Sequence, residues 1–172
     1  IGVYNCETKE SQELFSSKEV VKALKKEKAN LKGLDKSEYQ FLQPAAVYKN
    51  QIVFFFGAGL DIFREANMAS GDQGAVDFVL SYNLESKTFK TIHTYDKYTF
   101  SGVSDQSVVY NNKLYFNGVL APNKKDYDEI KSAEIYSYDF ETGKTTTEIK
   151  KGYHPFVHKG QLGYIALEKG DI

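Results

Sequence analysis

The fold class is decided by two stretches, Ser107-Val-Val-Tyr-Asn-Asn-Lys-Leu-Tyr-Phe-Asn117 and Ala133-Glu-Ile-Tyr-Ser-Tyr-Asp-Phe-Glu-Thr-Gly-Lys144. Both consist of short runs of aromatic and β-branched residues, which are typical of pleated strands. The turn residues at Asn111–Asn112 and Glu141–Lys144 fit tight turns, because Asn and Gly tolerate a positive φ. We therefore predict two antiparallel hairpins, the second completed by residues 145–149.

Imperfect copies of both hairpins occur elsewhere in the chain, and in the same order. The first hairpin recurs at residues 45–56 and again at residues 155–165, and the second recurs at residues 76–95. The repeating unit is therefore four short antiparallel strands with a period of about 50 residues.

This repeat resembles the blades of kelch-related and TolB-like β-propellers, which are common in bacterial extracytoplasmic proteins. The resemblance covers residues 38–172. It implies an all-β fold of four-stranded antiparallel blades, placed at residues 39–96, 97–150 and, as a partial third blade, 151–172. Propellers contain about 4 to 8 blades, whereas this chain holds about two and a half. Either blades are missing from a longer parent chain, or several chains complete one ring, or the units form an open assembly.

Residues 1–38 carry the one convincing helix signal and are treated as a separate N-terminal segment. Ser16 is a good N-cap, and Glu19 three residues later completes a capping box. Phe15 and Val20 occupy the two positions of a hydrophobic staple. The lysines that follow are interspersed with glutamates, so we interpret them as a solvated helix surface rather than a phosphate- or membrane-binding face.

Composition excludes some classes of function. The formal net charge of −1 argues against a nucleic-acid partner, since such proteins usually carry a basic excess. No apolar run approaches the roughly 20 residues needed to span a membrane. The single cysteine, Cys6, allows no internal disulfide and is interpreted as a structural or free thiol.

The connections between predicted strands differ sharply in length. The turns within hairpins are minimal, whereas residues 57–74, 117–132 and 96–106 form long connections that should all lie on one face of the blades. Long loops on a rigid scaffold are the usual location of binding residues. We expect a protein, peptide or glycan partner to bind there. The candidate residues are Asp61, Arg64, Asp72, Asp126, Tyr127 and Asp128.

No pattern for catalysis, metal or cofactor binding stands out. Gly57-x-Gly59 is followed by Ile62 where a dinucleotide fingerprint needs glycine. The run Asp126-Tyr-Asp-Glu129 does not match an EF-hand and is interpreted as a solvated charged loop. We therefore predict a binding or scaffold module without catalytic residues, metal or cofactor.

Two alternatives stay open at this point. The chain could be the non-catalytic propeller portion of a larger hydrolase, or a structural module that self-assembles to close its ring. An extracytoplasmic location is expected from the resemblance.

Overall fold

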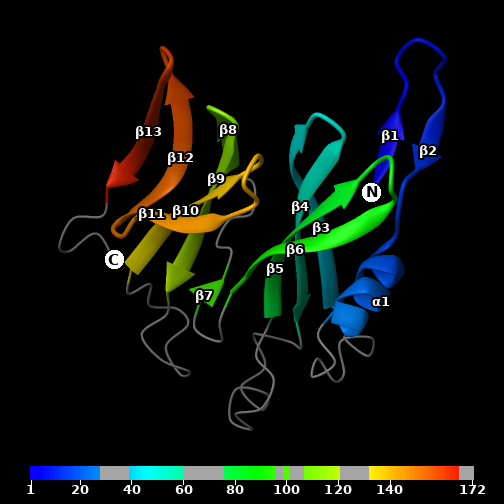
Figure 1. Ribbon diagram of the computed structural model, residues 1–172, viewed down its shortest axis with the longest axis horizontal. Helices are drawn as coiled ribbons and strands as arrows, with labels where there is room; N and C mark the ends of the chain where they lie inside the picture. The colour runs from blue at the N-terminus through cyan, green and yellow to red at the C-terminus, as the bar shows by residue number, and fades with distance from the viewer. Residues whose placement is uncertain (28–38, 60–75, 96–98, 101–106, 121–131, 167–172) are drawn as a thin grey trace, which may run out of the picture.

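The computed structural model is built almost entirely of β-strands, and it describes residues 1–27, 39–59, 76–95, 99–100, 107–120 and 132–166. The described residues form thirteen strands and one helix, with the strands arranged in four antiparallel sheets (Figure 1). This confirms the prediction of an all-β chain with a single helix. No sheet closes on itself within these residues.

The first large sheet is a four-stranded meander in which strands adjacent in sequence are also adjacent in space. Its strands, in spatial order, are β3 (Tyr39–Tyr48), β4 (Gln51–Gly59), β5 (Val76–Asn83) and β6 (Thr88–Thr94). The tight turn after Tyr48 places Lys49 at a φ of 52°. Pro44 lies at a bulge in β3, where a residue without a backbone N–H is tolerated.

The second large sheet repeats this order. Its strands are β8 (Ser107–Tyr110), β9 (Lys113–Leu120), β10 (Ser132–Asp139) and β11 (Thr145–Ile149), with β7 (Thr99–Phe100) paired to the far end of β9. Both hairpins predicted from the opening stretches are thus confirmed. The long connection predicted over residues 96–106 contains β7, a strand too short to show alternation in sequence.

The turns between the third and fourth strands of the two sheets use the same hydrogen bonds. The side-chain Oδ1 of Asn83 accepts hydrogen bonds from the backbone N–H groups two and three residues further on, both at 2.9 Å. Asp139 does the same at 2.9 and 2.8 Å. Positive φ angles follow at Lys87 (54°) and Gly143 (68°). The sequence repeat is therefore a repeat of local geometry.

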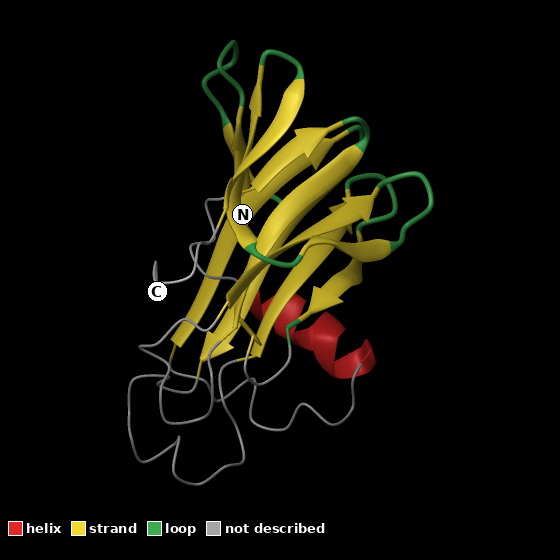
Figure 2. Cartoon of the chain, turned by 90° about the vertical axis from the view of Figure 1, so that its left-hand side faces the viewer, coloured by secondary structure: helices red, strands yellow, loops and turns green. Residues whose placement is uncertain are grey.

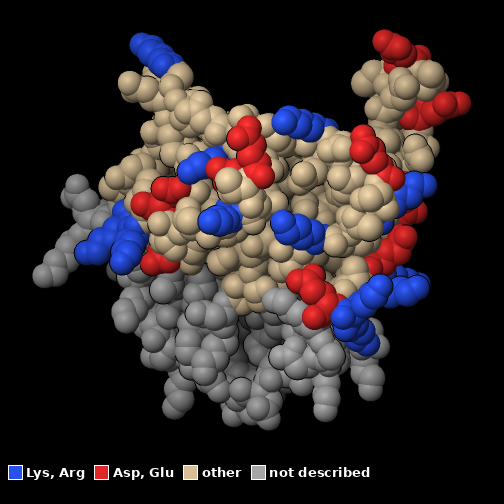
Figure 3. All heavy atoms as spheres, viewed as in Figure 1, with Lys and Arg blue, Asp and Glu red and all other residues tan. Residues whose placement is uncertain are grey.

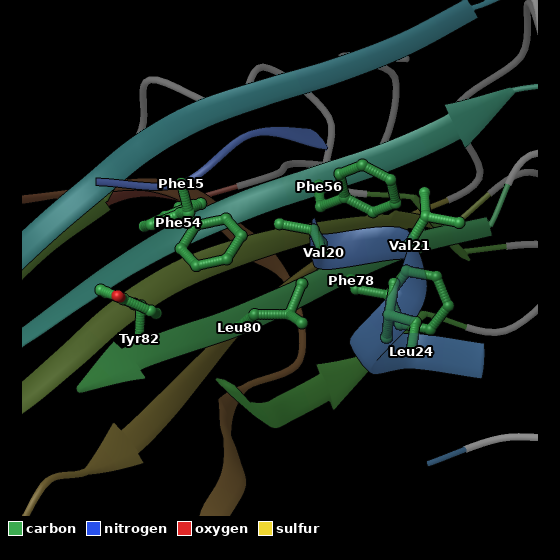
Figure 4. Packing of buried hydrophobic residues seen from close by; sticks show 9 residues of the cluster. All are labelled: Phe15, Val20, Val21, Leu24, Phe54, Phe56, Phe78, Leu80 and Tyr82. Carbon is green, nitrogen blue, oxygen red and sulfur yellow. The ribbon is translucent and has the colours of Figure 1, made fainter. Parts of the chain in front are cut away.

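Helix α1 (Ser17–Glu27) covers one face of the first sheet. Its Ser16 backbone N–H donates to the Glu19 carboxylate at 2.8 Å, as a capping box requires. Val20 and Leu24 are fully buried against the sheet. Figure 4 shows these helix side chains meeting Phe54, Phe56, Phe78 and Leu80 from β4 and β5.

The opposite face of the first sheet packs against the second sheet. Alternate residues of β4 point to opposite faces, so Phe54 lies under the helix while Val53 and Phe55 face the second sheet. There they meet Leu114 and Phe116 of β9. The chain thus forms consecutive layers of helix, first sheet and second sheet.

A short hairpin lies at each end of this stack (Figure 1). The N-terminal hairpin consists of β1 (Gly2–Tyr4) and β2 (Ser11–Glu13), and the C-terminal hairpin of β12 (Gly152–His158) and β13 (Gln161–Ala166). Within the described residues, β1 pairs with β2 alone. The C-terminal hairpin packs on the second sheet as a further layer, near β8, β9 and β10.

Candidate functional site

A cleft of about 310 Å³ lies between the two large sheets. One wall is the β5–β6 turn of the first sheet and the other is the β10–β11 turn of the second sheet. Figure 2 shows these tight turns gathered at one end of the molecule. The cleft therefore lies at the tight-turn end, opposite the strand ends that lead into the long connections.

The lining is dominated by uncharged groups that donate and accept hydrogen bonds. Hydroxyls and amides come from Gln51, Ser81, Asn83, Ser86, Thr88 and Thr142, and the remaining lining residues are Lys90, Tyr138, Phe140, Glu141 and Gly143. One cation and one anion leave the cleft without net charge. Over the described face of the molecule, too, basic and acidic side chains are interspersed rather than gathered in one patch (Figure 3).

Aromatic packing forms the rigid floor of the cleft. The Phe140 ring stacks on Tyr48 of the first sheet at 4.2 Å between centroids and 16° between planes. The Lys90 ammonium lies 5.9 Å from the centroid of the Tyr138 ring, within the range of a cation–π contact. Phe140 and Tyr138 are themselves buried, so they position the walls more than they offer surface to a ligand.

Glu141 is held at the rim by a chain of hydrogen bonds between the sheets. Its carboxylate accepts from the Asn112 side-chain amide at 3.1 Å, and the Asn112 carbonyl oxygen accepts from the Tyr48 hydroxyl at 2.9 Å. This chain of hydrogen bonds links the first sheet to the second beside the cleft.

The Asp139 carboxylate stabilises the β10–β11 turn, which forms one wall of the cleft. This carboxylate accepts hydrogen bonds from the backbone N–H groups of Thr142 and Glu141, and these bonds hold the pKa of the carboxyl below its usual value. The ionised carboxylate thus stabilises the turn through its hydrogen bonds to Glu141 and Thr142.

Several hydroxyls of the lining are hydrogen-bonded within the protein. The Ser86 hydroxyl is hydrogen-bonded to the Thr88 hydroxyl at 2.7 Å, and the Thr142 hydroxyl is hydrogen-bonded to the Asp139 carboxylate. No histidine, cysteine or aspartate lines the cleft. Its volume is at the low end of the roughly 300–1,000 Å³ of small-molecule sites.

No family model, curated protein or solved structure matches this chain.

The candidate residues proposed from sequence all lie outside the described residues. They are Asp61, Arg64, Asp72, Asp126, Tyr127 and Asp128. Their role stays a prediction.

A second cluster of polar aromatic side chains lies between the two sheets, around the start of the 96–106 connection. The His93 ring lies 4.5 Å from Tyr136 and meets Tyr95 edge to face at 4.7 Å. The Tyr95 hydroxyl donates to the Asn117 carbonyl at 2.6 Å, and the Tyr136 hydroxyl to Glu134 at 3.0 Å. These contacts make the cluster part of the packing between sheets.

The described part of the chain shows neither a metal-binding cluster nor a membrane-spanning helix. It contains no group of three or more His, Cys, Asp or Glu side chains placed to hold a metal ion. None of its helical structure has the length and apolar character to cross a membrane.

Sequence reasoning missed the cleft because its walls are about one repeat apart in the chain. A sequence signal for the cleft was nevertheless present. When the two repeats are aligned, the turn after Asn83 matches the turn after Asp139. Equivalent turns of neighbouring units lie at the same end, so the space between them could have been named as a candidate.

Proposed function

We propose that this chain is a non-catalytic recognition module that binds a small, neutral, hydroxyl-rich ligand, such as a glycan unit, in the cleft between the two sheets. The observation that carries the proposal is the lining itself. Seven of the lining residues bear a hydroxyl or amide group in the side chain, and the lining carries no net charge. Ligand hydroxyls can donate to and accept from such groups.

The scaffold part of the proposal is that the two large sheets are neighbouring blades of a propeller-like repeat. Their equivalent turns support this reading, and so does a further shared contact. The Asn50 carbonyl accepts from the Leu84 N–H at 2.8 Å, and the Asn112 carbonyl accepts from the Phe140 N–H at 3.1 Å. In each four-stranded unit, the same backbone hydrogen bond thus joins the first tight turn to the second. The two units pack face to face.

The ligand test uses nuclear magnetic resonance of labelled protein titrated with a panel of neutral mono- and disaccharides. We expect a subset of sugars to shift the amide signals of Ser86, Thr142 and Gly143. Thr88→Tyr should abolish these shifts, because the larger side chain fills the cleft. Thr147→Tyr is the matched control, since Thr147 is an exposed strand threonine that does not line the cleft.

Two results would count against the cleft. Shifts confined to residues 60–75 or 121–131 would move recognition to the long loops, in favour of Asp61, Arg64, Asp72, Asp126, Tyr127 and Asp128. Charge reversal at Asp61, Arg64 and Asp128 together would then weaken binding. Absence of shifts with every sugar at millimolar concentration would overturn the glycan proposal.

The broader setting is also a proposal. The repeat supports an extracytoplasmic binding or scaffold role for a protein, peptide or glycan partner, with a hydrolase-associated propeller as the alternative. The gene sequence on either side of these residues tests both, because it shows whether an export signal or a catalytic domain is encoded beside them.

A further inference from the structure

The cleft between the two large sheets contains one ammonium and one carboxylate that are not paired with each other. Lys90 comes from β6 of the first sheet, and Glu141 comes from the β10–β11 turn of the second sheet. Both side chains are exposed. Within the described residues, Lys113–Glu148 is the ion pair that forms, and neither Lys90 nor Glu141 takes part in one. Both charges of the lining are therefore available to a ligand.

The contacts of the two charged groups leave each of them room for a further hydrogen bond. The Glu141 carboxylate accepts from the Asn112 amide at its Oε1 atom, at 3.1 Å, and the Oε2 atom accepts from no described residue. The Lys90 ammonium lies 5.9 Å from the centroid of the Tyr138 ring, near the outer limit of a cation–π contact. This weak contact positions the ammonium without using its three N–H donors.

The side chain of Lys90 crosses the cleft to the opposite wall. A Cβ atom added at Gly143 would fall 2.9 Å from the Lys90 Nζ atom. In the equivalent turn of the first sheet, a lysine, Lys87, takes the positive φ (54°) that Gly143 takes here (68°). The backbone conformation alone therefore does not explain the glycine. Its missing Cβ leaves the space that the Lys90 ammonium occupies, two residues from Glu141.

A secondary amide is the neutral group that satisfies both charges at once. An ammonium only donates hydrogen bonds and a carboxylate only accepts them, whereas an amide has an acceptor on one side and a donor on the other. With a hydrogen bond at each end, an amide spans about 8 Å between its two partners. Residues 141 and 143 have Cα atoms at most about 7 Å apart, so the turn presents the two charged groups at this scale.

We propose that the ligand of the cleft is an N-acylated amino sugar, such as an N-acetylhexosamine. The acetamido carbonyl accepts from the Lys90 ammonium, and the acetamido N–H donates to the Glu141 carboxylate. The hydroxyls of the sugar ring meet the hydroxyl and amide side chains of the lining. This inference rests on the sugar site proposed above and names the class of sugar that the site selects.

The test compares sugars in matched pairs that differ in the acetamido group. Labelled protein is titrated with glucose and N-acetylglucosamine, galactose and N-acetylgalactosamine, and mannose and N-acetylmannosamine, followed by nuclear magnetic resonance. In the pair whose ring fits the cleft, the N-acetyl sugar should bind about tenfold more tightly, because hydrogen bonds to charged groups are the stronger ones. The signals of Thr142 and Gly143 should shift most, since these residues lie in the turn beside both charged groups.

Two variants remove one charged group each. Lys90→Met keeps the length of the side chain and removes the donor, so the two members of the pair should bind within about twofold of each other. Lys144→Met is the matched control, because Lys144 is exposed and does not line the cleft. Glu141→Ala should also lower the preference, and Glu85→Ala, in the equivalent turn of the first sheet, should not.

A third variant displaces the Lys90 ammonium without changing its charge. Gly143→Ala places a methyl group where the ammonium lies, so it should lower the preference for the N-acetyl sugar. Gly160→Ala is the matched control: Gly160 has a φ of 72°, so its backbone is strained to a similar degree, but an added Cβ meets nothing within 4 Å. Thermal unfolding verifies that each variant folds.

The outcomes distinguish this inference from the sugar site on which it rests. Equal affinity within every pair would overturn the inference and leave the sugar site standing. A preference that survives both Lys90→Met and Gly143→Ala would overturn it as well. Binding of N-methylacetamide as tightly as the preferred sugar would contradict the assignment to a sugar, since this amide carries no hydroxyl. Absence of binding by all six sugars would remove the sugar site, and this inference with it.

Discussion

Three glycines in strands are covered by an aromatic ring. Phe41 lies over Gly57, Phe156 over Gly163 and Tyr164 over Gly152. A Cβ added at Gly57 would fall 1.9 Å from Cε1 of the Phe41 ring, far closer than real contacts allow. Glycine is therefore required at position 57 by a close approach rather than by an unusual φ.

Gly57→Ala should destabilise the chain by about 1–3 kcal/mol, because the added methyl group forces the Phe41 ring and the strand apart. Chemical denaturation measures the loss. Combining Gly57→Ala with Phe41→Leu should recover part of it, since leucine leaves room for the methyl group. Losses that simply add in the double variant would show that the ring is not the obstacle.

At the scale of the element, a polar ladder joins three strands of the second sheet. The Glu148 carboxylate accepts a hydrogen bond from the Ser137 hydroxyl at 2.6 Å and from the Lys113 ammonium at 3.3 Å. The bond from Ser137 is the main reason that the pKa of Glu148 is lowered. The bond to Glu148 in turn raises the pKa of Lys113. The charged forms of both groups are therefore favoured by folding.

Stability should fall in acid partly through Glu148. A carboxyl whose pKa is lower in the folded state than in the unfolded state stabilises the fold above its unfolded pKa. That contribution disappears as the pH falls through the folded pKa. Glu148→Gln should therefore be less stable than wild type at neutral pH, and this difference should shrink below about pH 4. Urea denaturation across this range measures it.

Ser137→Ala provides the internal control for this effect. Without the hydroxyl, the pKa of Glu148 should move toward its ordinary value, so adding Glu148→Gln should change the pH dependence less than it does in wild type. An identical change in both backgrounds would exclude Ser137 as the cause.

Local pattern was enough to predict the hairpins and the start of the helix. Asn112 and Gly160 follow residues that also adopt positive φ, and the sequence pairs Asn111–Asn112 and Lys159–Gly160 signal such turns directly. The N-terminal hairpin was missed because its strands are fully exposed and carry no alternation of apolar and polar residues.

The order of the layers could not be predicted from sequence. In β4 the run Phe54-Phe-Phe56 is apolar on both faces, so it does not tell which face receives the helix and which receives the second sheet. The cleft depends on that order, since its two walls meet only after the sheets stack. The tight turns that form the two walls were predicted from sequence. Their position next to each other follows from the packing of one sheet on the other.

At the scale of the whole molecule, stability depends on apolar packing between the facing surfaces of adjacent layers. The helix supplies Val20, Val21 and Leu24 to the first cluster of buried residues, and the second cluster joins the two sheets. The first sheet therefore packs against helix α1 on one face and against the second sheet on the other.

Leu24→Ala should therefore cost about 2–5 kcal/mol, because Leu24 is fully buried between the helix and the first sheet. Lys22→Ala is the matched control on the exposed side of the same helix and should change stability by less than about 0.5 kcal/mol. Denaturant titration followed by circular dichroism measures both. Equal losses in the two variants would contradict the packing role assigned to Leu24.

Helix α1 lies on the face of the first sheet opposite to the one that meets the second sheet, so it occupies the place another sheet of the same kind would take. Residues 1–27 combine a polar outer surface with an apolar stripe on α1 that packs on the first sheet. In protein design they could be used to cover the exposed face of a repeat array. Fusing this piece ahead of an idealised tandem copy of the second sheet would give a designed array a soluble terminus. Its inner stripe would have to be redrawn to fit the new face, and the rest of the helix could be kept as it stands.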